Sequence, residues 1–433
     1  MSQVLDKVVS KTSVRLIPFM LALYILSFLD RSNIGFAKAA YQLDTGLSDE
    51  AYAFGAGVFF VAYAFLGVPA NLMMRKLGAR TWIGVTTVIW GLLSGLMGVA
   101  DTQMKFIVVR ILLGAAEAGF FPGMIYLTSQ WFPEKNRAAI MGLFYMGAPL
   151  ALSLGSPISG ALLEMHGFMG HPGWFWMFVL EGALAVGAGI FTFIYLDNSP
   201  KEARFLSAEE KGILVKQLES EDSVKTASKL SDAFSNVKIW HLAIIYMIIQ
   251  ISVYGLTFFL PTQVASLMGT TVGFKASLVT AIPWLAALIG TYVIPHYSDR
   301  TGNRIGLAAI TLFVAGLGIG GSALLAGTPV LAIVALCFAA MGFIAVQPIF
   351  WTIPSNMLSG AALAAGIGFI NMFGAFGGFL APIIKVYADK YFNSPMGGLL
   401  TLCAITIVGA LAIYVLKSVK TDEAKRPIEK TIS

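Results

Sequence analysis

Twelve apolar segments, each about 20 residues long, follow one another through this sequence, and an α-helix of that length crosses the hydrocarbon core of a bilayer. Hydrophobic residues make up 57% of the chain and charged residues only 12%, whereas soluble proteins carry roughly 25% charged residues. The sequence therefore predicts an all-α membrane protein with twelve transmembrane helices. Their expected centres are Leu26, Val61, Trp90, Glu117, Leu150, Leu184, Gln250, Leu285, Val314, Met341, Phe373 and Val408.

One long polar stretch separates the first six apolar segments from the last six. We therefore predict an N-terminal six-helix bundle in residues 1–196, a cytoplasmic linker in 197–238, and a C-terminal six-helix bundle with a cytoplasmic tail in 239–433. Within the linker, Ser207 and Glu210 have the spacing of a capping box, which predicts a short amphipathic helix beginning there.

The two halves also resemble each other in sequence. The segment MRKLGAR at 74–80 follows the second apolar segment, and SDRTGNR at 298–304 follows the eighth. Their glycines, Gly78 and Gly302, are 224 residues apart, close to half of the chain. A duplicated six-plus-six arrangement is typical of transporters, whose substrate site lies near the middle of the membrane between the repeats. The repeat predicts two pseudo-symmetric bundles and disfavours one continuous bundle, such as a receptor or a membrane enzyme.

Lysine and arginine are distributed unevenly between the two sides of the predicted membrane. If Arg31 and Arg110 are set aside as intramembrane residues, 22 of the remaining 27 lie on the side that holds both termini and the linker. Cytoplasmic loops carry the excess of positive charge in membrane proteins. Both termini are therefore expected in the cytoplasm.

Four charged residues are expected at membrane depth: Asp30 and Arg31 in the first segment, Arg110 and Glu117 in the fourth. A charge at mid-membrane costs roughly 2.5–3.5 kcal/mol on insertion scales, so each requires a reason. Arg110 and Glu117 are seven residues apart and so lie two turns apart on one helical face. The charges either neutralise one another to hold helices together or form a water-lined site for a charged solute. Their occurrence in two segments favours the second interpretation.

A charged loop resembles a motif of a known superfamily. The residues Asp299-Arg300-x-Gly302-x-Arg304 are similar to the motif between the eighth and ninth helices of the major facilitator superfamily. The resemblance implies a latch of charges at helix ends that stabilises one conformation. In the first copy of the loop Arg75 stands where an acid is usual, so a latch there would be weaker or paired differently.

Other stretches resemble the anion:cation symporter family within that superfamily. These are DRSN at 30–33, WFP at 131–133 and FLSAEEK at 205–211, and the likeness covers essentially the whole chain. Further stretches, such as FLDRSNIGFAK and RAAIMGLFYMGAPLAL, resemble the family's L-rhamnonate transporters most, and its D-galactonate and tartrate transporters more loosely. The resemblance implies a proton-coupled symporter that imports a sugar acid, first of all L-rhamnonate, by alternating access. D-galactonate, tartrate or 4-hydroxyphenylacetate are the alternative substrates.

Substrates of this family are carboxylates, so the site requires cationic donors. A guanidinium matches a carboxylate with two parallel hydrogen bonds, and we expect Arg31 to bind the substrate. Arg110 either contacts the substrate or neutralises Glu117 and Asp30. The resemblance implies that Asp30 and Glu117 couple transport to protons, because a buried acid that exchanges an arginine partner can bind and release a proton. Glu181 is expected to be structural.

Recognition of substrate hydroxyl groups requires neutral donors and acceptors. Buried polar groups in a membrane require partners, so polar residues one turn apart in an apolar segment are expected to face a cavity. The resemblance implies that Tyr63 is a binding residue, because it matches a binding position of the family. The other neutral residues expected at the site are Gln250, Tyr254, Gln347, Trp351 and Asn371. Two of these residues have a structural alternative to substrate binding. Tyr63 could be a packing residue, and Asn371 could form a hydrogen bond between helices.

Other classes of function find no support in the sequence. No Ser-His-Asp set, metal cluster or nucleotide-binding loop is apparent, so neither an enzyme nor a bound metal or cofactor is predicted. The net charge of +6 is spread between apolar segments without interleaved aromatics, which disfavours nucleic acid. A sensor would require a signalling domain larger than the polar segments. The partners expected are a small organic anion, protons and the lipid bilayer, for a functional monomer in a bacterial inner membrane.

Overall fold

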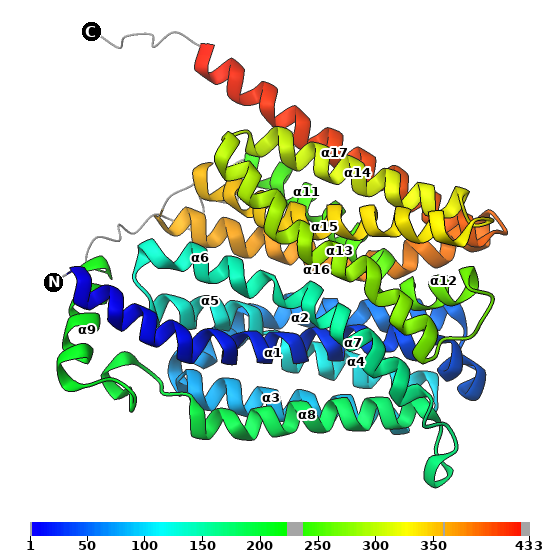
Figure 1. Ribbon diagram of the computed structural model, residues 1–433, viewed down its shortest axis with the longest axis horizontal. Helices are drawn as coiled ribbons and strands as arrows, with labels where there is room; N and C mark the ends of the chain where they lie inside the picture. Colours follow the sequence, from blue (N-terminus) through cyan, green and yellow to red (C-terminus); the bar gives the residue numbers. More distant parts are fainter. Residues whose placement is uncertain (1, 223–236, 358–359, 426–433) are drawn as a thin grey trace.

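The helices lie along one long axis in two groups, α1 to α8 and α11 to α17 (Figure 1). The computed structural model describes residues 2–222, 237–357 and 360–425, and regular structure within these ranges is helical. Both described chain ends and helix α9 lie at the same end of the molecule, on the left in Figure 1. We call this the terminal end, and the opposite end the far end.

Eight helices build the N-terminal half. Ser48 accepts a hydrogen bond from the Ala51 backbone N–H and so caps α2, and Thr102 caps α4 through the N–H of Lys105. Such side chains satisfy backbone donors that have no partner within the helix. The helices are α1 (Ser2–Thr45), α2 (Asp49–Leu77), α3 (Ala79–Leu96), α4 (Gln103–Glu117), α5 (Phe120–Trp131), α6 (Glu134–Tyr145), α7 (Gly147–Leu163) and α8 (Gly173–Tyr195).

Seven described helices build the C-terminal half. The charged loop of the sequence motif joins two of them: Gly302 has a φ of 67° and donates its N–H to Ser298 O, while the Asn303 side chain caps the next helix. Glycine suits this left-handed cap because it has no Cβ, whereas a positive φ is sterically unfavourable for other residues. The helices are α11 (Val237–Thr257), α12 (Leu260–Leu267), α13 (Phe274–Thr301), α14 (Arg304–Leu324), α15 (Pro329–Met357), α16 (Gly360–Tyr391) and α17 (Pro395–Lys425).

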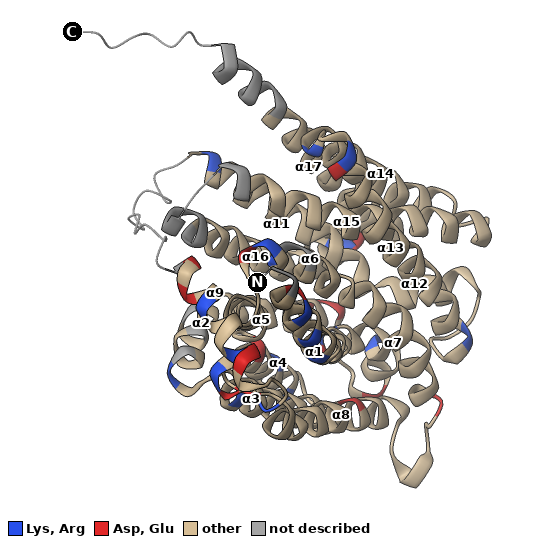
Figure 2. Cartoon of the chain, turned by 60° about the vertical axis from the view of Figure 1, so that its left-hand side comes forward, with Lys and Arg blue, Asp and Glu red and all other residues tan. Residues whose placement is uncertain are grey.

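Within the described residues, eleven helical segments are long and apolar enough to cross a membrane. The twelfth expected segment, centred on Glu117, consists of α4 and α5 in succession because the helix is interrupted at Ala118 and Gly119. Most of the helical ribbon carries no charged residue (Figure 2). The all-α prediction is confirmed, and the structure adds that the fourth span is broken directly after a buried acid.

Two helix pairs join the halves. Helix α2 packs on α16, and α7 packs on α13. In the order of the spans these are the second with the eleventh and the fifth with the eighth. In the repeat, the second span corresponds to the eighth and the fifth corresponds to the eleventh, so each pair is the counterpart of the other. Two repeats related by a pseudo-two-fold axis require this correspondence.

Two polar contacts between the halves lie at the far end. Lys390 of α16 forms an ion pair with Glu50 of α2, with 2.7 Å between Nζ and Oε1. The Oε1 atom of Glu164, just after α7, accepts a hydrogen bond of 2.9 Å from the backbone N–H of Phe274, the first residue of α13. Both helix pairs are thus held together at the end away from the termini.

Close backbone packing closes the same end. At Gly57 of α2, an added Cβ would lie 2.5 Å from the backbone oxygen of Phe379 in α16. Backbone atoms cannot move aside as the end of a flexible side chain can, so Gly57→Ala is expected to separate the two helices and open the far end. A thiol reagent that does not cross membranes should then modify a Tyr254→Cys reporter faster from the far side, in a background without the native cysteines.

The control for this prediction is Gly187→Ala on α8, where an added Cβ meets nothing within 4 Å. Equal labelling rates in the two alanine variants would show that the contact at Gly57 does not hold the far end closed.

Helix α9 (Ala208–Asp222) begins with the predicted capping box. The Ser207 hydroxyl accepts a hydrogen bond from the Glu210 N–H (3.2 Å), and Glu210 Oε2 accepts one from the Ser207 N–H (2.7 Å). Glu210 also pairs with Lys11 of α1 at 2.9 Å. The Ser207 N–H and then Lys11 lower the pKa of the Glu210 carboxyl. The capping box is confirmed, and it holds α9 against the first helix.

The other end of α9 contacts α6. Glu221 Oε2 accepts a hydrogen bond of 2.9 Å from the backbone N–H of Glu134, the first residue of α6, and lies 3.3 Å from Arg137. The described part of the linker is therefore docked on the N-terminal half. Residues 223–236 of the predicted linker and 426–433 of the predicted tail lie outside the described residues.

The charged loop contains an ion pair between two of its own residues. Arg304 Nη2 lies 3.4 Å from Asp299 Oδ1, and Arg300 is exposed at the end of α13. The side chain of Arg75 in the first copy lies outside the described part of the chain. The latch role of Asp299, Arg300 and Arg304 stays a prediction.

Candidate functional site

A cavity with about 630 Å³ of empty space lies between the two halves. Its walls come from α1, α2, α5 and α6 on one side and from α11, α15 and α16 on the other. Six of the eight residues predicted to bind substrate line it: Arg31, Tyr63, Gln250, Tyr254, Gln347 and Asn371.

Arg31 is the cation of this cavity. Its Nη2 lies 2.7 Å from Glu117 Oε2, and its Nη1 donates a hydrogen bond of 3.2 Å to the Tyr254 hydroxyl of the other half. Four aromatic ring centres lie between 5.1 and 6.0 Å from the guanidinium carbon: those of Phe28, Phe59, Phe60 and Tyr63. Cation–π contacts of this kind stabilise a guanidinium that has left water. One side chain therefore links an acid of α4, a hydroxyl of α11 and an aromatic wall.

Glu117 is the last residue of α4, at the break before α5. It is fully buried, and its Oε2 accepts hydrogen bonds from Arg31 (2.7 Å) and from the Ser27 hydroxyl (3.1 Å). Its Oε1 has no hydrogen-bond partner among the described residues. A buried carboxylate oxygen without a partner is costly, so this oxygen is a place where a proton can bind.

Asp30 lies next to Arg31 but on another face of α1. Its Oδ1 accepts a hydrogen bond of 2.8 Å from the Ser94 hydroxyl on α3, and Oδ2 has no partner among the described residues. The side chain is buried and does not line the cavity. The two predicted proton-coupling acids therefore differ: Glu117 contacts the cationic residue of the site, and Asp30 lies inside the N-terminal half.

Arg110 also lies away from the cavity. It is fully buried in α4, and it donates hydrogen bonds to the backbone oxygens of Gly55 (3.3 Å) and Ala56 (3.2 Å) in α2. Its guanidinium carbon is 4.7 Å from the ring centre of Phe59, which Arg31 also contacts at 5.1 Å. The structure thus places Arg110 between α4 and α2, behind the ring that Arg31 faces.

The neutral residues of the prediction occupy the other side of the cavity. Gln250 Nε2 donates to the Tyr246 hydroxyl at 3.4 Å, while Gln250 Oε1 has no partner among the described residues. Gln347 and Asn371 line the cavity from α15 and α16. Trp351, one turn from Gln347, is outside the lining and packs on Tyr246 with 4.8 Å between ring centres.

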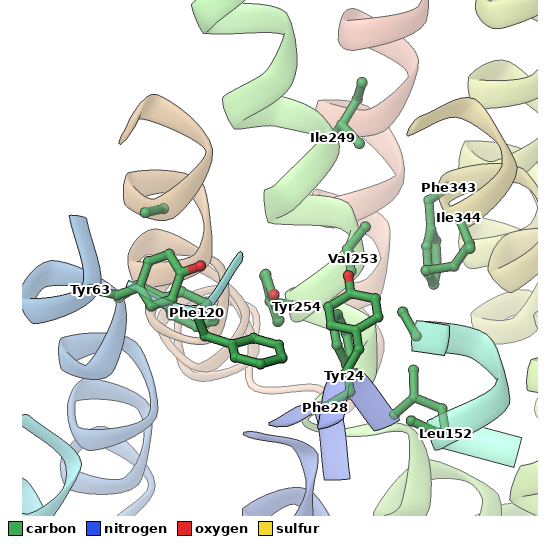
Figure 3. Close-up of a cluster of buried hydrophobic side chains, with 14 of the residues drawn as sticks. Tyr24, Phe28, Tyr63, Phe120, Leu152, Ile249, Val253, Tyr254, Phe343 and Ile344 are labelled. Atoms are coloured by element: carbon green, nitrogen blue, oxygen red, sulfur yellow. The ribbon is translucent and has the colours of Figure 1, made fainter. Parts of the chain in front are cut away.

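Aromatic residues that were not predicted from the sequence complete the cavity. Figure 3 shows Tyr24 and Phe28 of α1, Phe120 of α5 and Tyr254 of α11 grouped together. The tyrosines contribute hydroxyl groups to an otherwise apolar wall. Aromatic residues are frequent throughout this sequence (12%), so composition alone could not identify which ones face the cavity. The missed lining residues are Tyr24, Phe28, Phe60, Phe120, Phe121, Tyr145 and Tyr246.

Glu181 is a third buried acid, and it lies within α8. Its Oε1 accepts a hydrogen bond of 2.7 Å from the Ser159 hydroxyl of α7, and its Oε2 accepts one of 3.2 Å from Asn33 of α1. Both oxygens have partners, so this acid joins three helices. Among the described residues, no group of three or more His, Cys, Asp or Glu side chains is arranged to hold a metal ion.

Comparison with known proteins identifies relatives over nearly the whole chain. Residues 20–382 match the model of the Major Facilitator Superfamily. The chain is 70% identical over 417 residues to the inner membrane transport protein RhmT of Escherichia coli (strain K12), which covers 96% of this chain and 97% of that protein. It is 37% identical to a putative tartrate transporter of Agrobacterium vitis, over 97% of this chain and 94% of the relative.

Solved structures show the same fold. A bacterial homologue of the human lysosomal transporter Spinster, in an inward-facing and unoccupied conformation, superposes with a TM-score of 0.72 at 16% identity, covering 96% of this chain and 99% of the other. The inward-facing and occupied form of such a homologue gives a TM-score of 0.70 over 95% and 98%. The family match, the relatives and the fold agree that this chain is a membrane transporter, not an enzyme, and it belongs to the Major Facilitator Superfamily.

Proposed function

We propose that this transporter imports a sugar acid together with protons, and that L-rhamnonate is its first substrate. The observation that supports the proposal most is the Arg31–Glu117 pair, with 2.7 Å between Nη2 and Oε2, at the wall of a cavity between the halves. A transporter of organic anions requires a buried cation at such a place, and a proton-coupled one requires an acid that competes for it.

The pair explains how substrate and proton would be coupled. A guanidinium offers two parallel donors to one carboxylate, and one of the outer nitrogens of Arg31 is occupied by Glu117. Protonation of Glu117 removes the competing charge and frees this nitrogen for the substrate carboxylate. Loss of the proton restores the pair and displaces the anion. Proton and substrate then stabilise the same state of the transporter, which is the condition for thermodynamic coupling.

The rest of the cavity suits a hydroxylated substrate. Gln250, Gln347 and Asn371 supply amide donors and acceptors, and Tyr24 and Tyr145 add hydroxyl groups. Aromatic rings beside Arg31 would cover the apolar face of a sugar chain. An aromatic acid could stack on the same rings, and a relative bears the name of a tartrate transporter. A competition assay with a panel of acids would distinguish these substrates.

The direction of transport follows from placing the protein in a bacterial inner membrane with both termini in the cytoplasm, as the lysines and arginines suggest. The far end then faces the periplasm, and its closure by Glu50–Lys390 and Glu164–Phe274 corresponds to an inward-facing state of a functional monomer. The Spinster homologues with similar folds are inward-facing.

The test of the function is uptake of labelled L-rhamnonate by purified protein in liposomes, with an inward proton gradient and no sodium. We expect concentrative uptake that an ionophore abolishes. Accumulation of tartrate or galactonate in place of L-rhamnonate would contradict the proposed substrate. Equal uptake with and without a pH gradient would contradict the proposed coupling to protons.

Asp30→Asn tests the second acid. We expect uptake driven by the proton gradient to fall by roughly tenfold or more, because the neutral amide cannot carry a proton through the cycle. Binding of L-rhamnonate should persist, since Asp30 does not line the cavity. Full gradient-driven uptake by the variant would remove Asp30 from the coupling mechanism. Ser94→Ala, which deletes its hydrogen-bond partner but keeps the acid, is the matched control.

A further inference from the structure

We propose that the far end of the C-terminal half holds a second site for a polyhydroxylated carboxylate, where the incoming anion binds before the central cavity opens to that side. The proposal rests on the proposed import of a sugar acid for the chemistry of its ligand. The geometry is independent of the central site, because no residue lines both cavities.

The second cavity lies at the far end and has about 660 Å³ of empty space. It lies where α11 is interrupted before the short helix α12, and α14, α16 and α17 complete its walls. The ring of Phe259, at the interruption, forms part of the lining. The polar lining consists of one amine, one amide and three hydroxyl groups: Lys385, Gln263, Thr262, Ser266 and Ser322.

Lys385 is the cation of the second cavity. Its side chain is 14% exposed, and its Nζ lies 4.5 Å from the ring centre of Phe259. Among the described residues, its hydrogen-bond partner is Asp389, which is held separately by the N–H of Gly398 in the first turn of α17 (2.8 Å). An ammonium group has three donors. Lys385 can therefore bind a ligand carboxylate while Asp389 stays in place.

Gln263 supplies an acceptor in the same cavity. Its Nε2 donates a hydrogen bond of 3.1 Å to the Ser322 hydroxyl, which in turn donates to the backbone oxygen of Ile319 (2.8 Å). The amide orientation is thereby fixed, and Gln263 Oε1 has no partner among the described residues. A buried acceptor without a partner is unfavourable, and a hydroxyl group of a sugar acid would satisfy it.

An open cavity of the far end adjoins this site and shares Phe259, Lys385 and Pro395 with it. It also contains Lys38 and Lys390, whose charges are balanced by Asp49 and Glu50. An excess of positive charge is therefore not what would bind the anion. The proposed site depends on Lys385 and on the amide and hydroxyl groups beside it. The Glu50–Lys390 pair that joins the halves lies in the same open cavity, so a ligand here is next to the contact that must break for the far end to open.

The experiment is equilibrium binding of radiolabelled L-rhamnonate to the full-length protein in lipid nanodiscs. Arg31→Met removes the cation of the central cavity and should leave about one ligand bound per protein at millimolar concentration. Arg31→Met/Lys385→Met should bind none. Arg31→Met/Lys275→Met is the matched control, because Lys275 is an exposed lysine near the start of α13 and lines neither cavity. It should retain the binding.

Arg31→Met/Gln263→Leu keeps the Lys385–Asp389 pair and tests the site without removing a charge. We expect it to bind roughly tenfold more weakly than Arg31→Met, as the loss of a hydrogen bond in a buried site implies. If the wild-type protein binds L-rhamnonate and Arg31→Met binds none, the second site is overturned while the proposed function stands. If the wild-type protein binds none, both are overturned.

Discussion

Arg31→Met is expected to abolish L-rhamnonate uptake. Arg31 is the cation that lines the central cavity, and it contacts both Glu117 and the Tyr254 hydroxyl of the other half. Truncating one partner of a buried charged pair costs about 2–5 kcal/mol, which corresponds to a loss of binding of roughly 30-fold or more. Arg31→Lys should be nearly as inactive, because one ammonium group cannot reproduce the planar fork of donors. Uptake into liposomes and ligand binding measure both effects.

Loss of uptake could also follow from misfolding, because Arg31→Met leaves Glu117 buried without its cation. The double variant Arg31→Met/Glu117→Gln removes this unpaired charge and is the control. We expect it to recover the thermal stability of the wild-type protein while uptake stays absent. Recovery of uptake in the double variant would show that Arg31 neutralises Glu117 and does not bind the substrate.

Glu117→Gln is expected to separate binding from coupling. The amide resembles a protonated carboxyl group and cannot compete for Arg31 as a charge. In the wild-type protein, L-rhamnonate affinity should rise as the pH falls, because protonation of Glu117 removes the competitor. In the variant, affinity should stay high and independent of pH. Uptake against a concentration gradient should be lost, while exchange of labelled for unlabelled substrate across the membrane should persist.

Glu181→Gln is the matched control for this experiment. Glu181 is another buried acid of the same half, but its partners are Asn33 and Ser159 and it does not line the cavity. We expect the pH dependence of binding to survive this substitution. If Glu117→Gln kept the pH dependence and Glu181→Gln lost it, the coupling acid would be Glu181.

The fold could be predicted from the sequence because the bilayer imposes a length and a composition on every span. The two loops around Gly78 and Gly302 predicted the repeat, and the pairing of α2 with α16 and α7 with α13 agrees with it. The break at Ala118 and Gly119 was not predicted. Those residues are apolar or small and read as a continuous span, so hydropathy carries no signal for the interruption.

The charged and amide residues of the site could be predicted because polar side chains in an apolar segment are conspicuous. Gln250, Gln347 and Asn371 were found on this ground, and all three line the cavity. The presence of a polar side chain in an apolar segment could not show that Arg31 lines the cavity and Arg110 does not. Both are intramembrane arginines, and only the packing of α4 on α2 directs Arg110 to the backbone of Gly55 and away from the cavity.

The sequence by itself determined the number of spans, their division into two halves and the identity of four buried charges, since each follows from the cost of placing a residue type in lipid. The tertiary structure alone decided which partner each charge has: Glu117 for Arg31, Ser94 for Asp30, and the α2 backbone for Arg110. It also decided which aromatic rings enclose the cavity and that the far end is closed. These are properties of how helices distant in the chain pack together, and hydropathy along one segment carries no information about its neighbours.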